Sequence, residues 1–211
     1  MAKIERLEDC LEEAADLIKS GEVIVIPTDT VFGLACDACN REAVAKIYSL
    51  KKRPASKSLQ AIFPSVSRLK DFGLFLPSPL QLLAKAFLPG GLCPIALVEQ
   101  GCPLATVRQE DGIFSQAVRV PNLPALLKLA SLAGPLAASS ANLSSLPTAE
   151  NVQEAALEFG DSVPLCAFSD LPMGGKPSTV VRESESAPFG IEILREGAVP
   201  AGEIYRVLSD R

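Results

Sequence analysis

Residues 49–63 read SLKKRPASKSLQAIF, and this stretch joins the end of a predicted helix to the start of a predicted strand. In a chain of net charge −5 it concentrates positive charge at four positions, Lys51, Lys52, Arg53 and Lys57. Apolar residues spaced three and four apart upstream predict a helix capped by Asn40. Because Pro54 disfavours a helical conformation at the residue before it, we expect that helix to end near Arg53. Residues 59–63 then predict a short strand, so the cations lie at a helix-to-strand connection.

Helical and strand-like patterns alternate on both sides of this stretch. We expect helices over residues 7–20, 40–53, 65–72, 78–87, 122–133, 148–159 and 200–208. We expect strands over residues 23–27, 59–63, 92–98, 116–120, 136–138, 163–168, 178–182 and 191–194. Gly21 is expected to end the helix at 7–20, and Asn122 is expected to cap the helix at 122–133. Interleaving without an internal repeat is typical of an α/β fold with a mixed sheet.

The composition limits the classes of protein that the chain fits. Its 211 residues, 48% of them apolar, predict one domain over residues 1–211. Asp and Glu total 25 against 20 for Lys and Arg, which argues against a protein that coats DNA or RNA but not against one local anion pocket. The sequence has no histidine, so Ser–His and Cys–His pairs and histidine-containing zinc sites are excluded.

The sequence also predicts a cytoplasmic protein without a membrane segment. The first residues are charged and form no apolar signal segment, and the longest apolar stretch is broken by Lys128, Gly134 and Pro135. The six cysteines are therefore expected to remain reduced. Cys36 and Cys39 form a single C-x-x-C, for which two core residues are a better interpretation than a redox or metal site. We expect no bound metal held by the protein's own side chains.

Four segments share one arrangement, in which polar residues come close to a predicted strand. They are PTDTVFGL (27–34), KKRPASKS (51–58), SSANLS (139–144) and PSTVV (177–181). Ligands of α/β folds bind where such strand ends converge. Lys51, Arg53 and Lys57 suit a polyphosphate, or else form a solvated helix end. Ser140 and Asn142 suit a phosphate or a base, or else cap a turn.

Three further features leave alternatives open. GGKPSTVV (174–181) resembles part of a phosphate loop but lacks the spacing of a Walker motif. Arg119 stands within a predicted strand, so it requires a carboxylate partner, either internal or from a substrate. The loops at 100–115 and 169–177 are either mobile lids or ordinary surface loops.

Read in order, the motifs resemble those of the YrdC-like family, the L-threonylcarbamoyl-AMP synthases. The motifs are PTDTVFGLACDA, KKRPASKSLQAIF, LPGGLCPIAL, AVRVPNLP, AASSANLS followed by PT, PSTVV and ILREG. The resemblance covers a core of about residues 21–197 and suggests the short, single-domain form. It implies a twisted, mixed parallel and antiparallel sheet flanked by helices, with a concave, positively charged cleft.

The resemblance also implies an activity and roles for individual residues. The activity is a nucleotidyltransferase reaction that forms threonylcarbamoyl-AMP and pyrophosphate from L-threonine, bicarbonate or CO2, and ATP, as the first step of threonylcarbamoyladenosine formation in tRNA. The family's K-x-R and S-x-N signature falls on Lys51, Arg53, Ser140 and Asn142. The implied ATP contacts are Arg53, Lys57, Ser115, Ser140, Thr148 and Arg195. The implied threonine contacts are Thr30, Arg119, the backbone at Ala138, and Ser178. Mg²⁺ is expected with the phosphates. Downstream threonylcarbamoyl-transferase proteins and tRNA are the expected partners, and no membrane or DNA is.

The chain departs from the family pattern at several positions. LPGGLC (88–93) stands where W-P-G-P-L-T is usual, Ile62 replaces a histidine, and the segment at 144–148 is shortened. Ser115 replaces a threonine, and Arg182 stands where an acidic residue is expected. Two alternatives remain beside the synthase, namely an RNA-binding or translation-associated protein and a relative that forms carbamoyl-adenylate.

Overall fold

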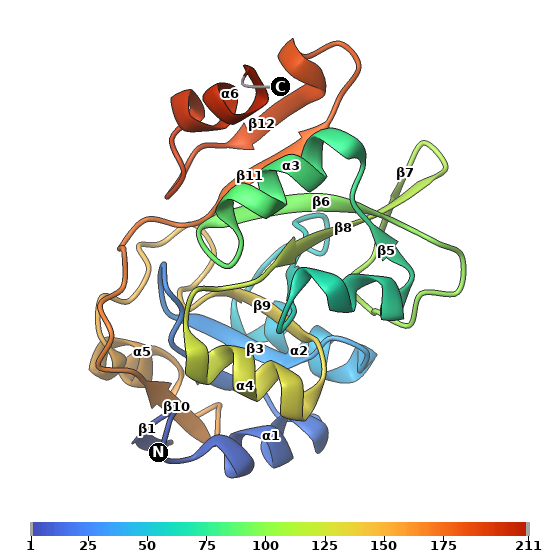
Figure 1. Ribbon diagram of the computed structural model, residues 1–211. Helices are drawn as coiled ribbons and strands as arrows, with labels where there is room; N and C mark the ends of the chain where they lie inside the picture. The colour runs from blue at the N-terminus through green and yellow to red at the C-terminus, as the bar shows by residue number, and fades with distance from the viewer. Residues whose placement is uncertain (1, 210–211) are drawn as a thin grey trace.

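The computed structural model describes residues 2–209, which build one twelve-stranded mixed sheet covered by helices (Figure 1). The strand order is β1-β10-β2-β3-β9-β4-β8-β6-β11-β12, with β5 paired to β6 and β7 paired to β8. The sheet contains parallel pairs such as β4–β8 and β6–β11 and antiparallel pairs such as β3–β9 and β6–β8. The expected mixed parallel and antiparallel sheet flanked by helices is confirmed.

The strands are β1 (Lys3–Arg6), β2 (Ile24–Ile26), β3 (Gly33–Asp37), β4 (Gln60–Ile62), β5 (Leu74–Phe75), β6 (Leu92–Val98), β7 (Arg108–Glu110), β8 (Ile113–Arg119), β9 (Leu136–Ser140), β10 (Leu165–Phe168), β11 (Thr179–Glu183) and β12 (Ile191–Arg195). The α-helices are α1 (Leu11–Lys19), α2 (Arg41–Leu50), α3 (Ser78–Phe87), α4 (Pro124–Ala133), α5 (Val152–Phe159) and α6 (Ala201–Ser209). Two 3₁₀ helices complete the order, η1 (Val66–Phe72) and η2 (Pro188–Gly190).

The central strands are buried on both faces, which explains the continuous apolar run before Pro27. Ile24 and Ile26 pack in one cluster with α1 and α4, whereas Val23 and Val25 pack in the other with α2 and α5. Figure 1 shows α1 and α4 in front of these strands and α2 behind them. Successive side chains of a strand point to opposite faces, so one short run contributes to both clusters.

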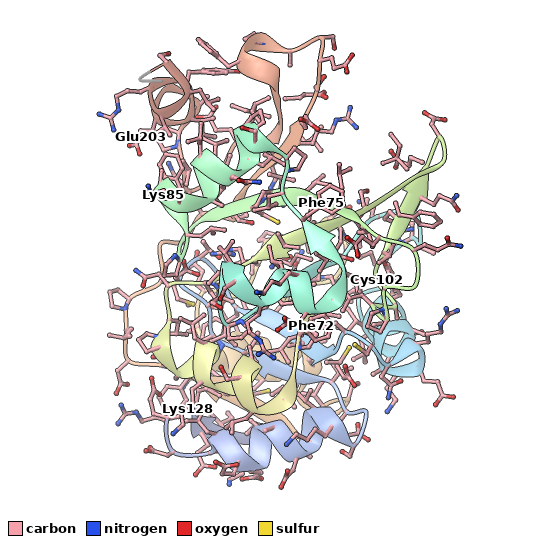
Figure 2. All side chains as sticks on the ribbon, turned by 45° about the vertical axis from the view of Figure 1, so that its right-hand side comes forward. Phe72, Phe75, Lys85, Cys102, Lys128 and Glu203 are labelled. Carbon is pink, nitrogen blue, oxygen red and sulfur yellow. The ribbon has the colours of Figure 1, made fainter. Side chains whose placement is uncertain are left out.

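The second half of the sheet, β8-β6-β11-β12, is covered by helices on one face. Leu92 and Ala96 of β6 are buried in the same cluster as Leu80 and Leu83 of α3. Helix α6 packs beside α3. The helices turn their polar side outward, and Figure 2 shows Lys85 of α3 and Lys128 of α4 at the surface. The opposite face of these strands is left to form a pocket.

Helix ends follow the predicted chemistry where a side chain or backbone conformation decides them. Asn40 caps α2, since its Oδ1 accepts hydrogen bonds from the N–H groups of Glu42 and Ala43 at 3.0 and 3.1 Å. At the end of α1, Gly21 has φ 85° and its backbone N–H donates to the carbonyl of Ile18. The backbone N–H of Glu22 donates to the carbonyl of Leu17. This pattern is a Schellman motif, which favours glycine at the left-handed position.

Several predicted elements were wrong. The first helix begins at Leu11 rather than residue 7, α2 ends at Leu50 rather than near Arg53, and the segment at 65–72 is a 3₁₀ helix. Asn122 does not cap α4, because Pro124 sets the start of that helix and Leu123 takes the cap position. Helix α5 begins at Val152 after the cap Asn151. The sequence analysis missed four strands, β1, β3, β5 and β7.

Four of the six cysteines are buried, and Cys39 and Cys102 are partly buried against the core. Cys36 lies fully buried in β3, and burial, followed by the charge of Asp37, raises the pKa of its thiol to about 12. A thiol with so high a pKa is almost entirely protonated at neutral pH and is a poor nucleophile. No group of metal-ligating side chains is found within residues 2–209, nor is any helix in that range long and apolar enough to cross a membrane.

Candidate functional site

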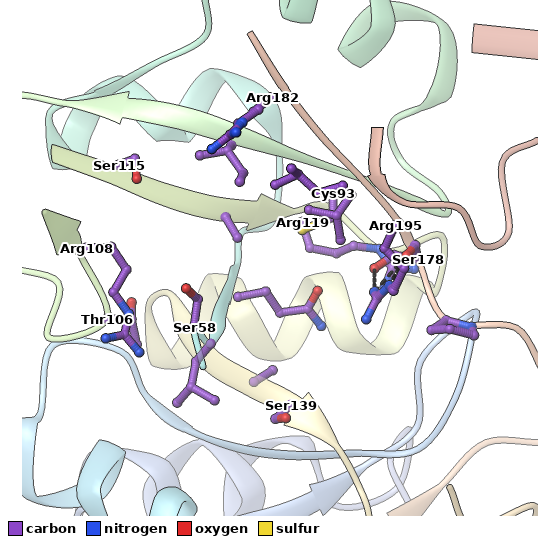
Figure 3. A pocket seen from close by; sticks show the side chains of 18 of the residues that line it. Ser58, Cys93, Thr106, Arg108, Ser115, Arg119, Ser139, Ser178, Arg182 and Arg195 are labelled. Carbon is purple, nitrogen blue, oxygen red and sulfur yellow. Dashed lines mark hydrogen bonds between the residues drawn. The ribbon is translucent and has the colours of Figure 1, made fainter. Parts of the chain in front are cut away.

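A pocket of about 780 Å³ lies on the face of β8, β6 and β11 that the helices leave open (Figure 3). Alternate residues of these strands line it: Cys93, Ile95 and Leu97 of β6, Ser115, Ala117 and Arg119 of β8, and Val180 and Arg182 of β11. Residues 138–140 at the end of β9, together with Thr30 and Arg53, form further parts of its wall. The strand period of two therefore selects which side chains reach the pocket.

Arg119 is buried at the inner end of the pocket and has an internal partner. Its side chain is 1% exposed, and its Nη2 donates to Asp29 Oδ1 at 2.6 Å. Its Nε donates to the carbonyl of Gly90 at 3.0 Å, and its Nη1 donates to Thr30 Oγ1 at 3.2 Å. The internal carboxylate is thus one partner of Arg119. One N–H on each terminal nitrogen remains for a ligand.

The chain bends at residues 29–31 and presents Asp29 and Thr30 to Arg119. Thr28 Oγ1 accepts hydrogen bonds from the N–H groups of Thr30 and Val31 at 3.0 and 3.1 Å. Gly174 and Gly175 donate to the carbonyls of Asp29 and Thr30 at 3.0 and 2.9 Å. The loop at 169–177 is therefore hydrogen-bonded to this bend.

The three consecutive cations after α2, Lys51, Lys52 and Arg53, lie in different environments. Lys52 has φ 47°, and its backbone N–H donates to the carbonyl of Ser49. The backbone N–H of Arg53 donates to the carbonyl of Tyr48 at 2.9 Å. The pattern is again a Schellman motif, here with lysine in the left-handed position. Lys51 is consequently buried, Lys52 is exposed, and Arg53 lines the pocket.

Lys51 supports the SSAN segment from below. Its Nζ donates to the carbonyl of Ser140, to the carbonyl of Asn142 at 2.6 Å and to Asn142 Oδ1 at 3.3 Å. The N–H of Ser144 donates back to the carbonyl of Lys51 at 2.9 Å. Burial, followed by the charge of Arg53, lowers the pKa of Lys51 to about 8. Lys51 fixes the position of Ser140, whose Oγ donates to Asn142 Oδ1 at 2.5 Å.

Replacing Lys51 by methionine should lower the free energy of unfolding by about 1–3 kcal/mol at pH 7, since two carbonyls lose their donor. In wild type the pKa of Lys51 rises from about 8 to 10.5 on unfolding. Between these values the folded protein binds fewer protons, so this residue makes stability rise with pH. The gap between wild type and K51M should therefore widen by roughly 2 kcal/mol from pH 7 to pH 9.5. Urea denaturation of both proteins at both pH values measures it.

Comparison of the two proteins cancels the titration of the thiols and of every other group that they share. A gap that narrows between pH 7 and pH 9.5 would mean that the three acceptor oxygens stabilise the ammonium more than burial penalises it, which would contradict the lowered pKa.

Three arginines that line the pocket are bound to neutral oxygens and not to carboxylates. Arg53 Nη2 donates to the carbonyl of Ser58 at 2.8 Å, and Arg108 Nη2 donates to the hydroxyl of Tyr48 at 2.9 Å. Arg195 binds the carbonyl of Ser178, and within residues 2–209 none of the three forms an ion pair. Burial lowers the pKa of Arg53, and the charges of Arg108 and Arg195 act in the same direction. An anion in the pocket would relieve this repulsion.

Arg195 is held against the start of β11 by close backbone packing. Its Nε and Nη2 donate to the carbonyl of Ser178 at 3.1 and 2.7 Å, and Nη2 also donates to Ser178 Oγ at 3.2 Å. A Cβ at Gly197 would lie 2.1 Å from the carbonyl oxygen of Pro177, so only glycine fits there. Gly197 also donates to Thr179 Oγ1 at 2.8 Å. This close approach of chain segments fixes Arg195 beside Ser178 (Figure 3).

The structure brings most of the predicted site residues to this one pocket. The residues that line it are Thr30, Arg53, Ser115, Arg119, Ala138, Ser140, Thr148, Ser178 and Arg195. Lys51 and Asn142 lie beneath the wall, as their contacts show, and Lys57 is exposed outside it. These three therefore do not line the pocket.

Other lining residues were missed by the sequence analysis, among them Ser58, Gln60, Cys93, Thr106 and Arg108. Arg108 carried a recognisable signal. Asp111-Gly112 is a two-residue hairpin turn with φ 49° and 82°, and it pairs Arg108 with Ser115.

A search of protein families matches residues 16–197 to the model Sua5_yciO_yrdC, which is described as "Telomere recombination". The chain is 32% identical over 208 residues to the threonylcarbamoyl-AMP synthase of Pyrococcus abyssi, with 98% of this chain and 59% of that protein covered. It is 31% identical over 199 residues to the threonylcarbamoyl-AMP synthase of Bacillus subtilis, with 94% and 56% covered.

The fold is also similar to a solved structure, the crystal structure of P. abyssi Sua5 complexed with L-threonine. The TM-score is 0.87 at 30% identity, and the match covers 98% of this chain and 61% of that one. This chain thus spans somewhat more than half the length of these relatives.

Proposed function

The chain belongs to the Sua5/YciO/YrdC family, as the motifs of its sequence indicated, and from this membership we propose that it is an L-threonylcarbamoyladenylate synthase. It joins L-threonine, bicarbonate or CO2, and ATP into threonylcarbamoyl-AMP and releases pyrophosphate. The observation that supports this most directly is the convergence of Arg53, Arg195 and Arg119 on one pocket with Ser178. The names of the similar proteins point the same way.

The proposed chemistry requires positioning and charge neutralisation more than proton transfer. The neutral amine of threonine adds to CO2 and loses one proton to water, which gives an anionic carbamate. A carbamate oxygen then attacks the α-phosphorus of ATP, and the bond to the departing pyrophosphate breaks. Because the nucleophile is already an anion, the protein must mainly align it with the phosphate and stabilise negative charge. This nucleotidyl transfer needs no histidine, in keeping with the composition.

We assign ATP to the cationic wall of the pocket. Arg53 and Arg195 would bind phosphate oxygens, with hydroxyl contacts from Ser115, Ser140 and Thr148 and an outer contact from the exposed Lys57. Lys51 and Asn142 would act by positioning Ser140 rather than by touching the substrate. Mg²⁺ would accompany the triphosphate, held by phosphate and water oxygens, since that ion commonly binds in this way.

We assign threonine to the inner end of the pocket. The two remaining N–H groups of Arg119 would bind its carboxylate, and Thr30, Ser178 and the backbone at Ala138 would contact the rest. Arg195 and Ser178 touch each other, so the two assignments bring the carbamate next to the nucleotide. This adjacency supports a reaction between the two ligands.

The proposal includes a single domain over residues 1–211, a cytoplasmic location, and transfer of the adenylate to downstream transferase proteins acting on tRNA. The RNA-binding alternative is not favoured, because the similar proteins are named as synthases. The similarity to the crystal structure of full-length HypF, at 20% identity and a TM-score of 0.71, concerns the fold alone.

Pyrophosphate release from ATP and bicarbonate, with and without L-threonine, tests the proposal. L-serine and D-threonine are the controls. Release that depends on L-threonine supports the synthase. A folded protein that releases no pyrophosphate with any of the three amino acids contradicts it.

A further inference from the structure

Arg108 lies opposite Ser115 in the β7–β8 hairpin, and both side chains line the pocket. The turn Asp111-Gly112 fixes this register, because both residues have positive φ and so close the hairpin in two residues. Directly paired residues project on the same face of a sheet. Arg108 is therefore placed by backbone geometry next to a residue that the family resemblance assigns to ATP.

The guanidinium of Arg108 is only partly used by the protein. Nη2 donates to the hydroxyl of Tyr48 at 2.9 Å and to the carbonyl of Ala55, while Tyr48 donates to the carbonyl of Lys57 at 3.0 Å. Within residues 2–209, Nε and Nη1 have no hydrogen-bond partner, which leaves three N–H donors for a ligand. Arg108 is therefore held through Nη2, and its Nε and Nη1 remain available to a ligand.

The charge of Arg108 is also unmatched. Arg119 forms an ion pair with Asp29, and Arg182 forms one with Glu192. Arg108 forms no ion pair in the described part of the chain. Arg108 and Arg53 both donate to carbonyls of the loop at 55–58, and holding two guanidinium groups against the same loop is unfavourable without an intervening anion. Planar guanidinium groups match phosphate oxygens closely, so a phosphate between Arg53 and Arg108 fits this arrangement.

We propose that Arg108 binds the β- and γ-phosphates of the nucleotide and thereby selects a triphosphate over a monophosphate. The assignment of these phosphates follows from position. Figure 3 shows Arg108 at the end of the pocket opposite Arg195 and Ser178, where the carbamate would meet the α-phosphate. The leaving pyrophosphate then extends toward Arg108. The inference rests on the proposed function, because it requires ATP in this pocket.

Calorimetric titration of wild type and R108Q with ATP and with AMP tests it. We expect R108Q to bind ATP about 10–100-fold more weakly, in line with the loss of a charged hydrogen bond. Binding of AMP should change less than about twofold. An R108Q protein with an unchanged ratio of ATP to AMP affinity would overturn the role of Arg108. Wild type that binds no ATP would overturn the proposed function itself, and the inference with it.

Three further variants distinguish an effect of the charge of Arg108 from an effect of its contacts with the loop at 51–58. R182Q removes a pocket arginine that is already paired, so it should keep the affinity ratio of wild type. Y48F removes the hydroxyl contact and keeps the charge of Arg108, so it should also keep that ratio. R108K should restore part of the preference for ATP. Equal weakening of ATP and AMP binding by R108Q, matched by Y48F, would show that Arg108 only holds the loop.

Discussion

Replacing Arg119 by methionine should lower the free energy of unfolding by about 3–5 kcal/mol, the largest loss expected of any change in this pocket. The substitution leaves the Asp29 carboxylate, whose side chain is 14% exposed, without its partner at 2.6 Å. It also removes the donors to Gly90 and Thr30. Urea denaturation of the wild-type and R119M proteins at neutral pH measures the difference.

A double-mutant cycle identifies the cause. D29N keeps the shape of the side chain but removes the negative charge, so R119M combined with D29N should be more stable than R119M alone. Equal stability of these two proteins would mean that the loss comes from packing or from the other hydrogen bonds. An unpaired buried carboxylate would then not be responsible.

The same D29N protein tests whether Arg119 binds the carboxylate of threonine directly. It retains the guanidinium and loses only the internal counter-charge, so a carboxylate ligand should bind at least as tightly as in wild type. Threonine that no longer binds to folded D29N would indicate that Arg119 organises the bend at 29–31 and makes no direct contact with substrate.

Replacing Arg53 by alanine should raise the activation free energy by about 2–4 kcal/mol, which is roughly a 30- to 1000-fold loss in kcat/KM for ATP. Arg53 is fixed by carbonyl oxygens of its own loop and has no carboxylate partner among the described residues. Its charge is therefore available to the phosphates. Threonine-dependent pyrophosphate release at several ATP concentrations measures the effect.

K52Q is the matched control, because Lys52 is the adjacent residue of the same cluster and is exposed. It should retain nearly the wild-type rate. If R53A and K52Q reduced the rate equally, the cluster would act through its summed charge, and the specific placement of Arg53 would have no role.

The sequence predicted best the features that a few neighbouring residues determine. The caps at Asn40 and Gly21 depend on one side chain and one backbone conformation, and both were confirmed. The cap at Asn122 was wrong because Pro124, a competing local signal, starts the helix instead. Strand β1 reads KIER, with no apolar alternation, and is stabilised by parallel pairing with distant β10.

Features that depend on the approach of distant segments could not be predicted. The sequence showed that Arg119 needs a partner but not that Asp29, ninety residues away, supplies one. Likewise Lys51 and Arg53 looked equivalent as cations. The fold separates them because the end of β9 and the residues that follow it lie against Lys51 and offer it three oxygen acceptors.

The left-handed conformation of Lys52 restricts which residues can occupy the middle of the K-x-R motif. Exposure alone would admit almost any side chain there, but φ 47° excludes valine, isoleucine and threonine on steric grounds. Glycine, asparagine and unbranched polar residues would be tolerated. This apparently free position thus carries a backbone constraint, and a β-branched residue there would misdirect Arg53 without touching any ligand.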